Sequence, residues 1–280
     1  MVKVPELKSQ WIWAVVLIIY ISTGVFVLNA PFQMSEATVR AYDYVESLKP
    51  GSICVLGGGN VFAFDLESSA GQIAAIKHIA RKGLKLVEFP TGVEGIIFHR
   101  YCIDAAHVDE QYGGPWKYGR DYVLLPYVPG GTTAVVAFLT NVHNLISTDL
   151  FGTPISQIPL MNQMRDYRDI ALWFMPHWAA ETYSPYIIGE RGVPLLFFAQ
   201  ASNYVTAAVY MNIYPDKMWV TNGFLGGAQY EKLVGAPGLG QSAVDGYTLL
   251  SGAFIAFVVL GNIQLLSRTG TKKEEVQVKK

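Results

Sequence analysis

Two long apolar runs lie near the ends of the chain, and neither contains a charged side chain. The first, residues 11–30 (WIWAVVLIIYISTGVFVLNA), has the length of about 20 residues that a helix needs to cross the hydrocarbon of a bilayer. The second, residues 246–267 (GYTLLSGAFIAFVVLGNIQLLS), is of similar length and lies between Asp245 and Arg268. Each run is therefore predicted to be a transmembrane helix.

Each of these runs also has an alternative interpretation. A cleaved signal peptide would have a shorter apolar core than residues 11–30 and a small-residue cleavage site. A helix buried in a soluble core would show a polar face, which residues 246–267 lack. Trp11 and Trp13 suit the headgroup level of a membrane, where an amphipathic ring is most stable. We therefore favour an anchor at each end.

Between the two runs, short apolar stretches alternate with longer stretches that have the spacing of helices. Near-continuous apolar strands that alternate with helices indicate a mostly parallel sheet with helices on both faces. We predict one α/β domain over residues 31–241, with a three-layer Rossmann-like or flavodoxin-like fold. The predicted strands are residues 53–56, 84–89, 122–128, 170–175, 195–199 and 218–221, and the predicted helices include residues 35–48, 93–106, 178–191 and 204–213.

The positive charges around the two runs predict an orientation. The outer tails, residues 1–10 and 268–280, carry seven Lys and Arg residues, whereas the inner flanks carry three, Arg40, Lys49 and Lys232. Because such residues are retained on the cytoplasmic side, we expect both termini in the cytoplasm and the domain outside the cell membrane. The polar tail at 268–280 is expected to be disordered.

Overall composition restricts the function classes. With 51% hydrophobic and 15% charged residues, the chain is too apolar for an ordinary soluble protein. A net charge of −1 without any block of like charge argues against nucleic-acid binding, which needs a concentrated basic surface.

Two glycine-rich segments follow predicted strands. They are residues 57–60 (Gly57, Gly58, Gly59 and Asn60) and residues 130–133 (Gly130, Gly131, Thr132 and Thr133). In a flavodoxin-like strand order, both would border one crevice at the carboxyl ends of the strands. Backbone N–H groups and helix N-termini there would favour a small anionic or nucleotide-like ligand.

The competing interpretation is that both glycine segments are tight structural turns. The first segment lacks the third glycine of G-x-G-x-x-G, because Phe62 occupies that position, and the chain has no G-x-x-x-x-G-K-[ST] motif. We favour the structural interpretation and keep the ligand site as the alternative.

Other chemistry-bearing residues give weak patterns. His177 and Glu181 follow the fourth predicted strand and are either an acid/base pair in the same crevice or, as we favour, a polar contact at a helix start. The five histidines have no metal-ligand spacing, and no nucleophile motif is present, so we predict no metal, cofactor or catalytic residue. Cys54 and Cys102 are expected to be buried small hydrophobes, with a single bridge as the alternative in an oxidising compartment.

Three stretches resemble an uncharacterised prokaryotic family of membrane-anchored α/β proteins with a hydrophobic segment at each end. They are DYVLLPYVPGG at residues 121–131, TDLFGTPISQIPLM at residues 148–161 and NGFLGGAQYEKLVG at residues 222–235. The resemblance supports the architecture and implies no activity and no catalytic residue. Because residues 222–235 lie just before the second span, we also expect them as a candidate docking or oligomer surface close to the membrane.

These features together favour a non-enzymatic role. We expect a membrane-embedded assembly or scaffold component that contacts the lipid bilayer, further copies of itself or other membrane proteins. The alternative is a membrane-anchored binding protein or enzyme for a small anionic ligand. A transporter or channel is disfavoured, because the predicted spans contain no charged residue that could line an ion path.

Overall fold

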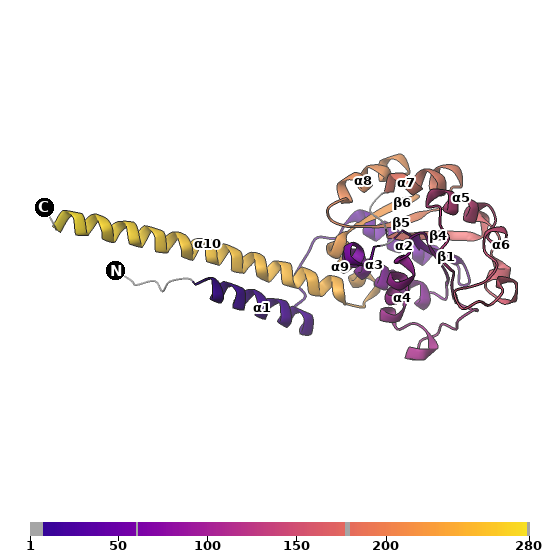
Figure 1. Ribbon diagram of the computed structural model, residues 1–280, viewed down its shortest axis with the longest axis horizontal. Helices are drawn as coiled ribbons and strands as arrows, with labels where there is room; N and C mark the ends of the chain where they lie inside the picture. Colours follow the sequence, from indigo (N-terminus) through magenta and orange to yellow (C-terminus); the bar gives the residue numbers. More distant parts are fainter. Residues whose placement is uncertain (1–7, 60, 177–179, 279–280) are drawn as a thin grey trace. The chain divides into compact units, whose positions relative to one another are not determined.

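The computed structural model describes residues 8–59, 61–176 and 180–278. The chain forms two units. Phe32–Gln241 is the larger unit and contains the sheet, while Met1–Pro31 and Ser242–Lys280 together make the smaller one, which holds the terminal helices (Figure 1).

The larger unit is built on a six-stranded, all-parallel sheet with the order β3-β2-β1-β4-β5-β6. All six strands coincide with stretches predicted from apolar runs, because strands covered on both faces have almost only apolar residues. They are β1 (Ile53–Gly58), β2 (Lys85–Pro90), β3 (Tyr122–Leu124), β4 (Ile170–Pro176), β5 (Leu195–Ala199) and β6 (Met218–Asn222).

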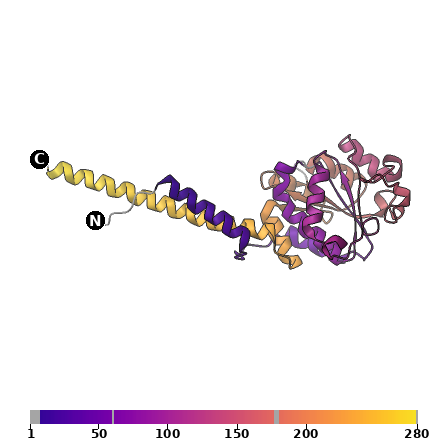
Figure 2. The ribbon, with the colours of Figure 1, turned by 60° about the horizontal axis from the view of Figure 1, so that its bottom comes forward.

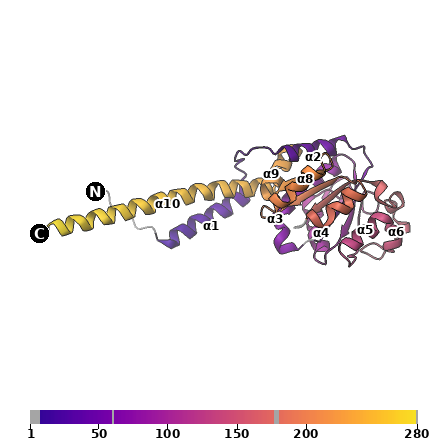
Figure 3. The ribbon, with the colours of Figure 1, turned by 90° about the horizontal axis from the view of Figure 1, so that it is seen from above.

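Helices cover both faces of this sheet (Figures 1, 2 and 3). Cys54 and Leu56 of β1 pack toward one helical layer, and Val55 between them packs toward the other, because successive strand residues point to opposite faces. The first layer contains α2 (Glu36–Ser47), α3 (Phe62–Arg81), α4 (Gly95–Ala106) and α9 (Gly223–Val234). The second contains α5 (Thr132–Thr140), α6 (Val142–Leu145), α7 (Ala180–Ser184), the π-helical η5 (Pro185–Glu190) and α8 (Tyr204–Ile213).

Short 3-10 turns complete the larger unit. They occur in the long connections before β3 and β4 and are η1 (Glu110–Tyr112), η2 (Ile155–Gln157), η3 (Met161–Gln163) and η4 (Tyr167–Asp169).

The strand order is that of a Rossmann-type doubly wound sheet. In a flavodoxin-like order β1 would lie beside β3, but here its neighbours are β2 and β4. The periodicity of the sequence gives the strands and their connections, and it carries no information on which strands pair. The direction of winding reverses between β1 and β4, the place where such sheets usually bind ligands.

Two predicted elements are shorter than expected. Strand β3 ends at Leu124, two residues before Pro126, which has no N–H to donate to a ladder. The predicted helix at residues 178–191 begins with residues that lie outside the described part. Its remainder is divided at Pro185, where the ring interrupts the helical hydrogen bonds and the turn becomes π-helical.

Helices α3 and α9 approach each other closely through glycine. A Cβ on Gly227 would lie 2.6 Å from the Cβ of Ala70, which is closer than carbon atoms pack. Gly223 and the residues from Gly226 to Glu231 are buried, whereas Leu225 is 38% exposed. About half of the stretch at residues 222–235, which was expected as a docking surface, therefore belongs to the interior of the domain.

The smaller unit contains α1 (Ser9–Val25) and α10 (Leu239–Val278), which begins at the end of the larger unit. In the described part of the chain, α10 alone is long and apolar enough to cross a membrane, over Leu239–Leu266. Helix α1 has 17 residues, so at about 1.5 Å per residue it falls short of a hydrocarbon core of about 30 Å. Residues 26–30 of the first predicted span are not helical.

The expectation of a disordered tail at residues 268–280 is wrong over most of its length. Helix α10 continues through the tail to Val278. Lys272, Lys273, Glu274 and Glu275 are all good helix formers, and the tail has no proline to end a helix that is already nucleated.

The end of α1 is held by Asp245 of α10. This buried carboxylate accepts hydrogen bonds from the backbone N–H groups of Leu28, Asn29 and Ala30, at 2.7, 3.3 and 2.7 Å. Asn29 adopts the left-handed conformation, with φ of 57°, so that three successive donors converge on one side chain. Asp245, the charged residue that borders the second predicted span, thus holds the last residues of the first predicted span in place.

Candidate functional site

The first glycine segment lies at the carboxyl end of β1, next to the reversal in strand order. Gly57 and Gly58 are the last residues of β1 and are buried, while Gly59 is half-buried and Asn60 is outside the described residues. A Cβ on Gly57 would lie 2.7 Å from the ring of Trp173, whose Nε1–H donates to the Gly57 carbonyl at 3.0 Å. Gly57 therefore has a packing role that needs no ligand.

The second glycine segment forms the turn into α5. Gly130 and Gly131 have φ angles of +126° and +52°, which side chains with a Cβ rarely adopt. Thr132 is half-buried and Thr133 is exposed, and the Thr133 N–H donates to the Gly130 carbonyl at 3.0 Å. The backbone conformation alone explains both glycines.

The two glycine segments do not border one crevice between adjacent strands. Strand β2 lies between β1 and β3, so the segments are separated by one strand. A Cβ on Gly131 would come within 3.9 Å of the Tyr183 hydroxyl on α7. His177 is outside the described residues, and Glu181 is exposed on α7. The eight of the ten predicted residues that the structure describes are therefore spread along the carboxyl edge.

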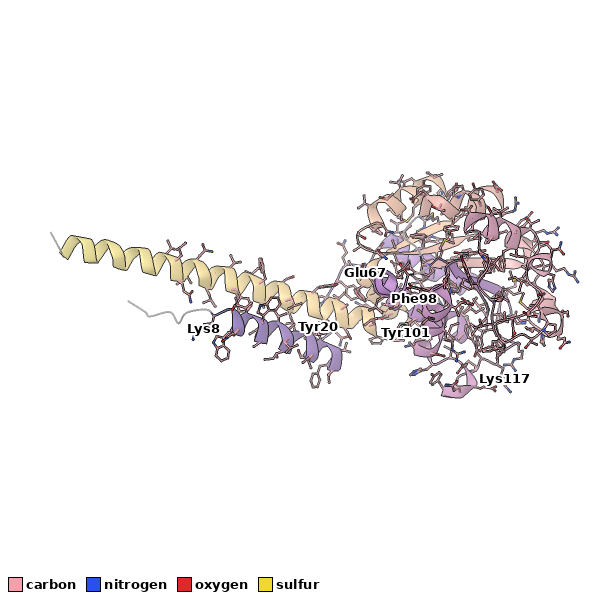
Figure 4. All side chains as sticks on the ribbon, in the orientation of Figure 1. Lys8, Tyr20, Glu67, Phe98, Tyr101 and Lys117 are labelled. Atoms are coloured by element: carbon pink, nitrogen blue, oxygen red, sulfur yellow. The ribbon has the colours of Figure 1, made fainter. Side chains whose placement is uncertain are left out.

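A buried carboxylate occupies the start of α3, where a Rossmann-type fold would bind an anion. Asp65 accepts hydrogen bonds from the Val61 N–H at 2.8 Å and from Gln200 Nε2 at 2.9 Å, and it is only 1% exposed. Glu67, which is labelled in Figure 4, lies two residues further along α3 and accepts from the Ala201 N–H at 3.2 Å. The helix N-terminus thus already holds a side-chain carboxyl group, which sequence analysis missed because Asp65 belongs to no phosphate-binding motif.

The remaining charges of the carboxyl edge are also negative. The loops after the strands and the first four described residues of the helices that follow contain Asp65, Glu94 and Glu181 and neither Lys nor Arg. A bound anion would lack a compensating positive charge there. This arrangement disfavours the anionic ligand that the glycine segments suggested.

A second buried pair, Glu88 and His99, lies between β2 and α4. Glu88 Oε1 is 2.7 Å from His99 Nδ1, and both side chains are almost fully buried. Burial raises the pKa of Glu88 well above its usual range and lowers the pKa of His99 to about 3. Both shifts favour the uncharged forms, because an apolar surrounding disfavours charge on either group. In the sequence, only the position of Glu88 within an apolar strand indicates this buried pair.

A further polar cluster joins α2, α3 and α9. Glu46 Oε1 and the Tyr230 hydroxyl each lie 2.9 Å from a ring nitrogen of His78, on Nε2 and Nδ1 respectively. Burial lowers the pKa of His78 to about 4. Although burial by itself raises the pKa of Glu46, hydrogen bonds from His78, Lys82 and Tyr42 lower it to about 2. A neutral His78 donates to the charged Glu46 and accepts from Tyr230.

The described part of the chain has no metal-binding cluster and no reactive cysteine. No group of three or more metal-ligating side chains occurs there. Cys54 and Cys102 are free and fully buried, so the alternative of a bridge is not found, and burial raises the pKa of both thiols. These thiols are poor nucleophiles in the folded chain.

Comparisons with protein-family models, with curated proteins and with solved structures find no match to this chain. Family and activity are therefore inferred from the residues of the chain itself. The described residues provide a Rossmann-type sheet whose ligand-binding edge is acidic and closed by internal hydrogen bonds.

Proposed function

We propose that this chain is a two-pass protein of the cell membrane that presents its α/β domain outside the cytoplasm as a non-catalytic component of a membrane assembly. The apolar α10 and the excess of Lys and Arg in the tails support the membrane location and the orientation. The acidic carboxyl edge and the inert buried thiols support a role without catalysis.

An uncovered apolar face on α8 carries the assembly part of the proposal. Val205, Val209 and Ile213 are spaced by four residues and are 76%, 54% and 55% exposed. We call these three residues the α8 stripe. On the opposite side of the helix, Ala207 is buried in the core. An amphipathic helix normally exposes its polar face, so an apolar stripe directed to solvent favours contact with another protein surface.

The assembly is tested with the full chain in detergent or nanodiscs by native mass measurement. We expect an oligomer for the natural chain and dissociation by Val209→Glu, because a carboxylate in an apolar contact must be desolvated. Thr140→Glu adds the same charge to an exposed position on a different helix, α5, and it should leave the oligomer intact. A monomeric natural chain that also retains no partner after mild cross-linking contradicts the proposal.

The alternative, binding of a small anion at the carboxyl edge, has less support. Asp65 occupies the helix N-terminus, and the described loops and helix starts of the edge contain neither Lys nor Arg. Thermal shift of the full chain against nucleotides and phosphorylated metabolites distinguishes the two functions. A stabilised melt that Asp65→Asn increases further would favour the alternative, because this substitution removes an acidic group from the anion's place.

A further inference from the structure

Helix α10 has one face that is covered by α1. The two helices lie side by side (Figures 1 and 3), and a Cβ on Gly246 would lie 3.2 Å from the Thr23 hydroxyl oxygen. Further along the apolar part of α10, the half-buried positions are Leu250, Ala253, Phe257 and Gln264. They recur every three, four or seven residues, which places them on one side of a helix. The other sides of this apolar part are exposed in the described chain.

A second face of α10, turned away from α1, has the spacing of a coiled-coil seam. Its residues follow one another at alternate steps of three and four, and all of them are exposed. We call them the α10 seam: Thr248, Ser251, Ile255, Val258, Asn262 and Leu265. Residues at this spacing keep facing a parallel helix when two helices wind around each other. Every helix has positions at such a spacing, so a partner is indicated only by the chemistry of the side chains.

Asn262 provides that chemistry. It lies within the uncharged run of residues 246–267, which at about 1.5 Å per residue covers the hydrocarbon of a bilayer. Its Nδ2 group donates to the Val258 carbonyl at 2.7 Å, and its other N–H and its Oδ1 have no partner among the described residues. An amide in hydrocarbon is unfavourable unless it is hydrogen-bonded, so an asparagine in a transmembrane helix favours contact with a second helix.

The amide also indicates what the second helix is. An amide both donates and accepts, so the same side chain on a second copy can satisfy both unpaired groups. Two copies in one membrane have the same orientation, and a two-fold axis along the membrane normal brings each seam residue against its counterpart. Ile255 and Asn262 are seven residues apart and occupy the same heptad position. A β-branched residue together with one asparagine at this position favours two parallel helices.

We propose that two copies of this chain pair in the membrane through the α10 seam, with the two Asn262 amides hydrogen-bonded to each other. This contact rests on the membrane location in the proposed function. It does not depend on the α8 stripe, which belongs to the other unit of the chain. The dissociation that Val209→Glu causes should therefore stop at pairs of chains.

Cysteine cross-linking in native membranes tests the pairing, because the natural Cys54 and Cys102 are buried. With copper phenanthroline and dissolved oxygen as the oxidant, Ile255→Cys and Val258→Cys should each form a disulfide-linked product of twice the chain mass. Ala256→Cys is the matched control. It is exposed and adjacent to Ile255 but points away from the seam, so it should cross-link at least tenfold less.

The role of the amide is tested by the dissociation constant of the pair in detergent, measured on chains that also contain Val209→Glu. Asn262→Ala should raise this constant about tenfold, because a hydrogen bond between transmembrane helices is lost. Asn262→Gln keeps an amide and should retain most of the affinity. Ile263→Ala changes the next residue, which lies outside the seam, and should leave the constant unchanged.

The outcomes separate this contact from the membrane location. Release of the chain by carbonate overturns both. For a chain that resists carbonate, the pairing alone is overturned if Ile255→Cys gives no dimer, if Ala256→Cys cross-links equally, or if Asn262→Ala does not weaken the pair. A cross-linked product that contains a different protein overturns the second copy as the partner.

Discussion

Individual residues in the two glycine segments are explained by local geometry. Gly57 makes room for the Trp173 ring, while Gly130 and Gly131 provide backbone angles that other residues rarely adopt. The sequence predicted turns at these places and left a ligand role open. The positive φ angles favour the structural interpretation for the second segment, because the turn needs glycine at these two positions whether or not a ligand binds.

A substitution at Gly131 tests this interpretation. We expect Gly131→Val to lower the free energy of unfolding by about 1–3 kcal/mol, because a β-branched residue at φ of +52° is strained. The measurement is the melting temperature of the full chain in detergent, with Thr133→Ala at the exposed neighbouring position as the control. An unchanged melt for Gly131→Val would show that the turn tolerates a side chain.

Acid should destabilise the fold through His78. Its pKa is about 4 in the folded chain, chiefly through burial, against a usual value of 6.5, so the unfolded chain binds the extra proton first. The stability contributed by neutral His78 is therefore present above pH 6.5 and is lost as the pH falls toward 4. The loss between pH 6.5 and 5 should be about 1.5 kcal/mol.

The variant His78→Gln separates this effect from other titrations. Glutamine can donate to Glu46 and accept from Tyr230 but does not titrate. The fall in melting temperature between pH 6.5 and 5 should therefore be smaller for His78→Gln than for the natural chain. His107→Gln, at an exposed position, is the control. An identical pH response in His78→Gln would contradict the assignment.

The contacts between elements depend mainly on close packing and on acidic side chains that accept hydrogen bonds from free backbone N–H groups. Glu231 at the end of α9 accepts hydrogen bonds from the N–H groups of Gly238, Gly240 and Gln241, and so caps the start of α10. Asp245 in turn holds the chain after α1. From the sequence, Asp245 was only the border of an apolar run, because the partner N–H groups lie more than 200 positions away.

Hydrogen exchange tests the role of Asp245. Asp245→Asn should accelerate exchange of the Leu28 and Ala30 amides by about 10–100-fold, since a hydrogen bond to a charged group contributes about 1.5–3 kcal/mol. The measurement is made on the full chain in detergent. Ile263→Ala changes an exposed residue further along α10 and should have no effect. Equal protection in Asp245→Asn would show that the turn is held by other contacts.

For the whole molecule, the orientation in the membrane is the prediction with the widest consequences. Cysteine accessibility in intact cells tests it, because the natural Cys54 and Cys102 are buried and give a low background. A cysteine in place of Phe151, which is 63% exposed on the domain, should react with an impermeant maleimide. A cysteine in place of Lys273 should react only after the cells are permeabilised.

The reverse labelling pattern would place the domain in the cytoplasm and leave the α8 stripe facing cytoplasmic partners. Extraction by carbonate without detergent would remove the membrane assignment altogether. Release of the chain by carbonate would also show that α10 lies on a protein surface rather than in lipid.

The sequence by itself determined the elements. The strand at residues 195–199 and the helix at residues 204–213 have the predicted limits, because both follow from local runs of apolar residues and the breaks between them. The long apolar part of α10 is equally visible in the sequence, whereas the first apolar run has a helix that ends at Val25.

Only the tertiary structure decided which elements are neighbours. The order of the strands, the contact of His78 with Tyr230 and the backbone held by Asp245 all depend on residues that are distant in the chain. Periodicity records which face of an element is buried, and it does not record what that face is buried against. The residues with the clearest chemistry therefore became visible only when the chain was folded.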